Sequence, residues 1–288
     1  MVKKRLIASL LMRDGLMVQS LGFSQYLPIG HPRFPIEFVV KWDVDEIILL
    51  DISARKNGSG PNSEIIKLLS HFCFVPLTVG GGIESVADVR KLIRAGADKV
   101  SINTYALKRP QIISEVAAEF GSQCVVVSMD CRRGLDGRYW VYGDSGRYES
   151  GIEAIEWAAR SQQEGAGEIL VNSIDRDGSR VGYDIELIKS ITSAVNIPVI
   201  ACGGVGSFTH FTPGILEGGA DAVAASNIFH HVEHSTILAK AHLLRDGVDV
   251  RMDSKVNYEN RAFDDCGRLL MHDSFVLDGL DSVSRKVL

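Results

Sequence analysis

The sequence lacks a Cys-x-x-Cys pair, a Lys/Arg-rich run and an apolar stretch long enough to cross a membrane. Its five cysteines are an odd number, which is typical of a reduced, cytoplasmic protein rather than a disulfide framework. The net charge of −5 with no basic run argues against nucleic acid as a partner. The basic start is not followed by a signal-peptide layout, and no run approaches the ~18 apolar residues of a spanning helix. We therefore expect a cytoplasmic protein without nucleic-acid or membrane partners, and we assign no metal ion or cofactor.

Short apolar runs alternate with amphipathic helical stretches, such as 85–95 and 185–194, up to about residue 250. The eight runs are Leu6–Leu11, Ile47–Leu50, Pro76–Val79, Val100–Ile102, Val125–Met129, Ile169–Val171, Pro198–Ala201 and Ala222–Ala225. Apolar strands separated by helices indicate a parallel sheet covered on both faces. Eight such units favour an α/β fold of one closed (β/α)8 barrel, the TIM barrel, over an open sheet.

The two halves of the chain repeat each other. Glu46-Ile47-Ile48 and Glu168-Ile169-Leu170 lie 122 positions apart, and the same spacing relates Gly81-Gly82 to Gly203-Gly204. Such matches predict duplicated half-barrels of four β/α units each. We assign residues 1–252 to the barrel and 253–288, which fall outside the repeat, to a C-terminal extension that is either a docking tail or partly disordered.

Glycine-rich turns follow two strands that the repeat relates. Gly80-Gly81-Gly82 precedes a helix that begins near Ser85, and Gly203-Gly204 precedes one near Phe208. Glycine lets the backbone approach an anion closely, and a helix N-terminus supplies unpaired N–H groups. Two such turns at one barrel mouth predict a phosphorylated small-molecule ligand with a phosphate at each end.

Carboxylates at the C-terminal ends of barrel strands are the natural acid–base candidates. The candidates are Asp51, Asp130, Asp175 and Asp177. Asp130 is expected to end the fifth strand, and the repeat places Leu11 opposite it, at the end of the first. Leucine cannot transfer a proton, so a mechanism that needs two opposed carboxylates is broken, and Asp14 lies at the wrong depth to substitute well. Asp51 and Asp175 have an alternative role as caps of their own loops.

Four charged residues stand at the starts of apolar runs. They are Arg5, Glu46, Lys99 and Glu168. We expect all four to lie at the floor of the barrel, where partly buried charges must pair. Judged from the residues alone, a salt-bridge ring that plugs the floor is the simplest interpretation.

Several segments resemble the cyclase subunit of imidazole glycerol phosphate synthase. They are Val79–Ile83, Asp98–Thr104, Phe120–Gln123 and Ser173–Gly178. The resemblance covers roughly residues 3–252. It implies a duplicated barrel with a glutaminase subunit docked on its floor. In that family ammonia passes up through the barrel, and a bisphosphorylated ribonucleotide is cleaved and cyclised at the mouth.

The resemblance also implies roles for individual residues. One phosphate would bind at Gly82, Asn103 and Thr104, and the other at Gly178, Gly204, Ala225 and Ser226. We also predict that Gly81, Asp177 and Gly203 belong to this phosphate and substrate site. The four floor charges match the family's ammonia gate at every position, which reverses the interpretation as a plug. Asp98, Phe120 and Gln123 would lie at the glutaminase interface.

The departures from the family are informative. The family uses two catalytic aspartates, whereas this chain has Asp130 and, in the other place, Leu11. Ser9, Gln19 and the extension also depart from the usual pattern. Together with the segments Ser128–Arg132 and Val171–Ser173, they resemble a variant branch of surface-polysaccharide (lipopolysaccharide) biosynthesis. There ammonia is passed to a sugar amidotransferase that forms an acetamidino group. We expect an ammonia-conducting synthase subunit with an impaired cyclase step. The alternatives are an active cyclase of histidine biosynthesis and a phosphate-binding regulatory module.

Overall fold

Eight parallel strands close into a barrel in the computed structural model, which describes residues 3–54, 60–230, 234–252, 262–263 and 269–270. In order round the barrel, the strands are β1 (Arg5–Arg13), β4 (Glu46–Asp51), β5 (Leu77–Gly80), β6 (Lys99–Ile102), β7 (Val125–Arg133), β10 (Glu168–Ser173), β11 (Val199–Cys202) and β12 (Ala222–Ala225). The pairing of β7 with β10 closes the sheet. Each apolar run singled out in the sequence falls on one of these strands, so the predicted (β/α)8 barrel is confirmed.

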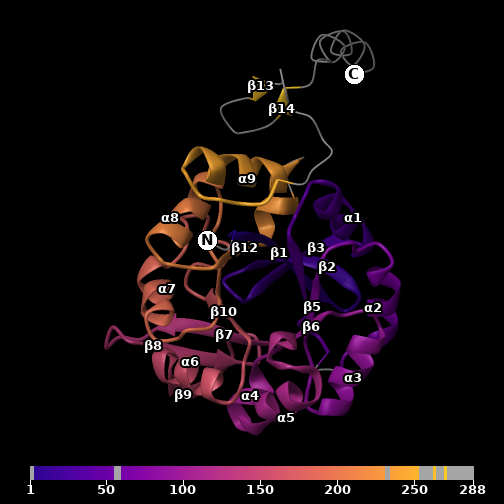
Figure 1. Ribbon diagram of the computed structural model, residues 1–288, viewed down its shortest axis with the longest axis vertical. Helices are drawn as coiled ribbons and strands as arrows, with labels where there is room; N and C mark the ends of the chain where they lie inside the picture. Colours follow the sequence, from indigo (N-terminus) through magenta and orange to yellow (C-terminus); the bar gives the residue numbers. More distant parts are fainter. Residues whose placement is uncertain (1–2, 55–59, 231–233, 253–261, 264–268, 271–288) are drawn as a thin grey trace.

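Helices surround the barrel (Figure 1). They are α1 (Arg33–Lys41), α2 (Ser63–Ser70), α3 (Val86–Arg94), α4 (Thr104–Lys108), α5 (Gln111–Phe120), α6 (Ala154–Gln163), α7 (Ile185–Thr192), α8 (Phe211–Leu216) and α9 (Ser235–Arg245). The short 3-10 helices are η1 (Ser122–Cys124), η2 (Phe208–His210) and η3 (Asn227–His230). Helix α3 is typical: Ser85 caps it by accepting from the Asp88 N–H, and Val89 and Leu92 are buried against the sheet. The helices expected at 85–95 and 185–194 are α3 and α7.

Two antiparallel hairpins extend the first and fifth barrel strands. Strand β1 pairs with β2 (Leu16–Leu21), which pairs with β3 (Gln25–Gly30). Strand β7 likewise pairs with β8 (Tyr139–Gly143), which pairs with β9 (Tyr148–Glu153). The prediction that Leu11 and Asp130 end their strands is therefore wrong by a few residues. Both strands continue because the hairpin partners supply ladder hydrogen bonds beyond the barrel.

The inside of the barrel is filled by an apolar layer. Alternation along β1 points Arg5, Ile7, Ser9 and Leu11 to the same face, in order from floor to mouth. The buried layer contains Ile7, Ile48, Val126, Leu170, Ile200, Cys202, Ala222 and Ala224. An eight-stranded barrel is just wide enough for such side chains to fill. The charged floor and the mouth are therefore separated by packed apolar side chains.

Most of the residues after 252, including Asp264, Asp265 and 275–277, lie outside the described part of the chain. Within it, β13 (Ala262–Phe263) pairs with β14 (Leu269–Leu270). The domain boundary at 252 stays a prediction. Shortly before it, Val250 bridges to Lys4 beside the start of β1, on the floor side of the barrel. Across the described residues, no helix combines the length and apolar character that membrane crossing needs.

Candidate active site and floor of the barrel

A cavity opens at the C-terminal ends of the barrel strands, and both Leu11 and Asp130 line it. Leu11 lies on β1 and Asp130 on β7, with β4, β5 and β6 between them on one side of the circle and β10, β11 and β12 on the other. The two residues therefore face the cavity from opposite sides. The repeat predicted this opposition correctly.

Asp130 is the buried carboxyl group of the mouth. Asn103 Nδ2 donates to its Oδ2 at 2.8 Å, and Asn172 Nδ2 lies 3.5 Å from its Oδ1. Burial raises the pKa of Asp130 to about 7, against the opposing effect of the two amide donors. A carboxyl group with a pKa near 7 can both take up and release a proton at neutral pH. Asp130 is thus suited to acid–base chemistry.

The other candidate carboxylates cannot restore a pair with Asp130 across the mouth. Asp14 is largely exposed, at 64% of its side-chain surface, pairs with Arg13 and is not among the residues that line the cavity. Asp51 lines the cavity, but its Oδ1 accepts from the backbone N–H and hydroxyl of Ser53, as a loop cap does. Asp175 accepts from the Arg133 N–H and also lies outside the cavity lining. The capping interpretation fits Asp51, whereas Asp175 bonds the end of β7 and not its own loop.

The structure brings all ten predicted phosphate-site residues to this one cavity. Gly81 has φ +110°, and a Cβ there would lie 2.1 Å from the Asp51 carbonyl oxygen. Gly204 has φ +102°, and a Cβ there would lie 2.1 Å from the Gly182 carbonyl oxygen. Both turns therefore require glycine. Phosphate binding itself stays a prediction. Arg180 also lines the cavity and adds a positive charge that the sequence analysis had not singled out.

The tips of the two hairpins meet over the mouth. Phe23, between β2 and β3, lies against Gly146, between β8 and β9, where an added Cβ would be 3.3 Å from the Phe23 ring. Asn227 Nδ2 donates to the Ser20 carbonyl oxygen of the first hairpin at 2.8 Å. Thr104, the repeat counterpart of Asn227, accepts through Oγ1 from the Asp144 N–H of the second at 2.9 Å. We call these two tips, residues 20–26 and 144–147, the roof of the cavity.

Asp177 connects the loop after β10 to the first hairpin. Its Oδ2 accepts from the Ser20 hydroxyl at 2.6 Å and from the Phe23 N–H at 3.1 Å. Burial raises the pKa of Asp177, and these donors oppose the shift. The residue lines the cavity as predicted, but its carboxylate is engaged by the hairpin.

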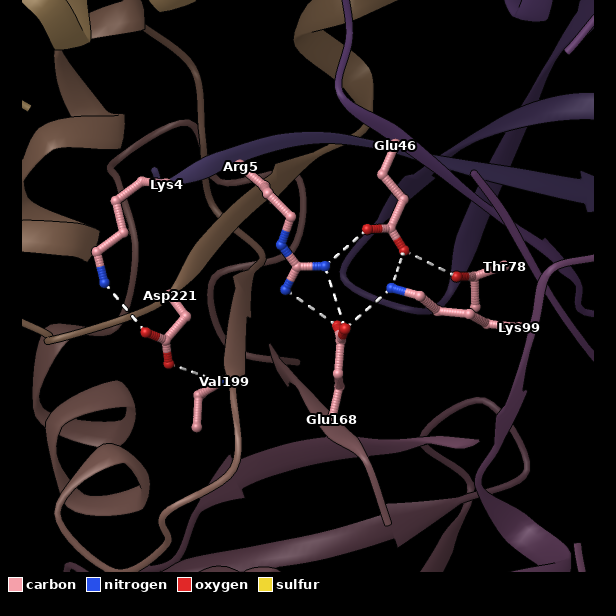
Figure 2. Close-up of polar contacts among 8 residues, drawn as sticks. All are labelled: Lys4, Arg5, Glu46, Thr78, Lys99, Glu168, Val199 and Asp221. Atoms are coloured by element: carbon pink, nitrogen blue, oxygen red, sulfur yellow. Dashed lines mark hydrogen bonds and ion pairs between the residues drawn. The ribbon is translucent and has the colours of Figure 1, made fainter. Parts of the chain in front are cut away.

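Four charges form a closed ring at the floor of the barrel (Figure 2). Arg5 lies 2.7 Å from Glu46 Oε2 and 3.1 Å from Glu168 Oε2. Lys99 Nζ lies 2.8 Å from Glu46 Oε1 and 2.9 Å from Glu168 Oε1. Thr78 also donates to Glu46, whose side chain is only 2% exposed. Burial opposes the charge on Arg5, but the two carboxylates outweigh it and raise the Arg5 pKa. The predicted ring is confirmed.

The predicted interface residues lie on the same side of the barrel as this ring. Asp98 is exposed, directly precedes Lys99 and accepts through Oδ2 from the Leu77 N–H at 2.8 Å. Gln123 donates to the carbonyl oxygen of Phe120 at the end of α5. Phe74, which precedes β5, is 83% exposed and was not singled out in the sequence. An exposed aromatic residue in a short inter-element loop has no sequence signal of its own.

The fold, the glycine turns and the buried carboxyl group define a duplicated (β/α)8 barrel with an enzyme-type mouth and a charged floor. The chain belongs to the histidine biosynthesis protein family, whose model matches residues 5–235. It is 48% identical over 269 residues to a Vibrio vulnificus (strain YJ016) protein provisionally named imidazole glycerol phosphate synthase subunit hisF2, covering 93% of this chain and 98% of that protein. It is 45% identical over 251 residues to the imidazole glycerol phosphate synthase subunit HisF of Alkaliphilus metalliredigens (strain QYMF), covering 87% of this chain and all of that protein. The HisF-like family assignment is confirmed.

Proposed function

We propose that this chain is the cyclase-type synthase subunit of a cytoplasmic glutamine amidotransferase complex, and that it conducts ammonia from a glutaminase on its floor to its mouth. The observation that carries the proposal is the floor ring of Arg5, Glu46, Lys99 and Glu168. It lies beneath an apolar interior that leads to a mouth with a buried acid–base group.

The ring supports a conduit because an inert plug would not need charges. Burying ions costs desolvation, and well-packed apolar side chains close a core at least as stably. Lys99 bonds both carboxylates and reaches them on a flexible stem. Moving it would open one side of the ring while Arg5 still pairs both carboxylates. The apolar layer above then favours neutral ammonia over ammonium, whose desolvation costs far more.

The mouth supports a ligand with a phosphate at each end. One phosphate binds at Gly81, Gly82, Asn103 and Thr104, and the other at Gly178, Gly203, Gly204, Ala225 and Ser226. Backbone N–H groups at glycine turns suit phosphate oxygens, and Arg180 supplies a charge at the second site. Leu11 removes one of the two expected aspartates, so we propose that the cyclase step is impaired.

We further propose that the ammonia serves an acetamidino group, formed by a separate sugar amidotransferase of lipopolysaccharide biosynthesis. Leu11, the extension after residue 252 and the segments Ser128–Arg132 and Val171–Ser173 support this acceptor. The longer of the two alignments, to the hisF2 protein, is compatible with a branch that has such an extension.

A second candidate function is an active cyclase of histidine biosynthesis. The 45% identity to a HisF subunit along its whole length favours it. So does Asp130, whose pKa of about 7 suits proton transfer without a second aspartate.

Glutaminase binding on the floor can be tested directly by titrating a HisH-type glutaminase in calorimetry. Phe74→Ala should weaken binding because an exposed aromatic residue is a common anchor of an interface. Phe120→Ala is a second variant, at a half-buried position that the resemblance assigns to this interface. Leu135→Ala is the matched control, since Leu135 is fully exposed but lies in the β7–β8 turn at the mouth end. Absence of binding by the wild-type chain, or equal losses in Phe74→Ala and Leu135→Ala, would count against a glutaminase on the floor.

A further inference from the structure

We propose that Asp177 is a positioning residue: it holds the turn Leu21–Ser24 of the first hairpin in place and thereby sets Phe23 in the roof of the mouth. This deepens the proposed function, because the roof covers the space to which ammonia would be delivered. Asp177 and the turn come from distant parts of the chain, 154 residues apart between Asp177 and Phe23. Their contact is therefore a tertiary contact between distant segments and not part of a local turn motif.

Hydrogen bonds join Asp177 to the turn at three points. Its carboxylate accepts from the Ser20 hydroxyl and the Phe23 N–H, at 2.6 and 3.1 Å. Its backbone carbonyl oxygen accepts from the Gly22 N–H at 3.1 Å. Hydrogen bonds to an ionised acceptor are stronger than neutral ones. The two consecutive N–H groups of the turn thus both point at Asp177.

The backbone of the first hairpin packs directly on Gly178, the residue after Asp177. Gly178 has φ +69°, and a Cβ there would lie 2.9 Å from the Leu21 Cα and 3.0 Å from the Ser20 carbonyl oxygen. No side chain could fit between the two segments. Asn227 fixes the same Ser20 carbonyl oxygen from another direction, at 2.8 Å.

The backbone of Phe23 shows that the turn must be held. Its φ is +56°, in the left-handed region that bulky residues rarely adopt. Such a conformation persists only where the surroundings fix it. Here the fixing contact is the Phe23 N–H bond to Asp177. The result is a Phe23 side chain that lines the cavity and contacts Gly146 of the opposite hairpin.

Amide hydrogen exchange of the free chain tests this inference without glutaminase or substrate, so its outcome is independent of the proposed function. In Asp177→Ala, exchange at Phe23 should rise about 10- to 100-fold, the equivalent of losing a hydrogen bond to a charged group, and Gly22, whose N–H bonds the backbone carbonyl oxygen that Ala keeps, should rise less. Amides of β10 should keep their wild-type rates. Asp177→Asn keeps an oxygen acceptor for the Phe23 N–H and should restore most of the protection.

Asp175→Ala is the matched control, because Asp175 lies in the same loop but bonds Arg133 outside the cavity. It should leave Gly22 and Phe23 unchanged. If Asp177→Ala does not fold, Ser20→Ala removes the other partner and should raise exchange at Phe23 several-fold, within the range of one neutral hydrogen bond (about 0.5–1.5 kcal/mol). Unchanged exchange in whichever variant folds, an Asn variant no better than Ala, or an equal rise in β10 would overturn the proposal.

Discussion

Leu11 and Asp130 face one cavity from opposite sides of the barrel, an apolar residue across from a buried carboxyl group. The two halves of the barrel are alike in sequence and in their hairpins, but at this pair of positions they differ chemically. An acid–base mechanism that uses both sides of a ligand needs a titratable group on each. On the β1 side this chain has Leu11, whose apolar side chain cannot titrate.

Leu11→Asp should therefore raise cyclase turnover. With free ammonium and the bisphosphorylated ribonucleotide substrate, we expect an increase on the order of 10²–10⁴, the usual contribution of one acid–base group. Leu11→Asn is the control, because it introduces a polar side chain of similar size that does not titrate. Steady-state turnover of the three proteins checks this. Wild-type turnover as high as that of a two-aspartate HisF would instead establish the active cyclase.

Asp130→Asn should stabilise the protein at neutral and alkaline pH. Burial raises the Asp130 pKa from 3.8 to about 7, so the folded state binds the proton more tightly than the unfolded state. The stability contributed by this group is present below pH ~4 and is lost as pH rises to ~7. We expect the variant to gain roughly 2–4 kcal/mol at pH 8 and nothing at pH 4. Denaturant unfolding at the two pH values measures it, and a gain equal at both would refute the burial argument.

Lys99→Ala should separate a conduit from a plug. In a plug, the variant loses about 1.5–3 kcal/mol, because Glu46 and Glu168 lose one charged partner but keep Arg5, and nothing else changes. In a gate, the ratio of amidated product to glutamine hydrolysed also changes in the complete system. Lys4→Ala is the matched control: Lys4 pairs with Asp221 at 3.1 Å on the same floor but outside the ring (Figure 2). A thermal melt checks folding, and an unaltered ratio would favour the plug.

Gly204→Ala should weaken binding of a bisphosphorylated ligand. The added Cβ would lie 2.1 Å from the Gly182 carbonyl oxygen, so the turn must move. Its N–H groups would then no longer point at the phosphate. We expect a loss on the order of tenfold in affinity by calorimetry. Gly247→Ala also places a side chain on a left-handed backbone, at φ +83°, but has open space around it and lies outside the cavity lining. Equal affinity for both variants would remove this turn from the binding site.

The barrel and its floor could be predicted from sequence because their signals are local. Each barrel strand is a nearly continuous apolar run, buried on both faces, and the ring residues stand at fixed positions before such runs. Alternation then carries Arg5 to the floor and Leu11 to the mouth of the same strand. The internal repeat predicted that Leu11 and Asp130 lie on opposite sides of the barrel.

The roof could not be predicted in the same way. Residues of β3 are mostly exposed, so Gln25–Gly30 shows no buried stripe that marks a strand. The position of Phe23 depends on Asp177 and Gly146, both far away in the sequence, and no periodic pattern encodes such contacts. Asp177 was accordingly predicted as a ligand-binding residue, and the hydrogen bonds of its carboxylate to Ser20 and Phe23 could not be foreseen.

The bridge between Val250 and Lys4 has a consequence for how complexes assemble. It anchors the chain beside the floor two residues before Met252, so the segment that follows is tethered at the face where the glutaminase is proposed to dock. A tethered segment meets a neighbouring surface at an effective concentration that reaches millimolar for short linkers. Affinity for a glutaminase should therefore be compared between the whole chain and a chain cut at 252, because the cut removes a segment that begins at this face.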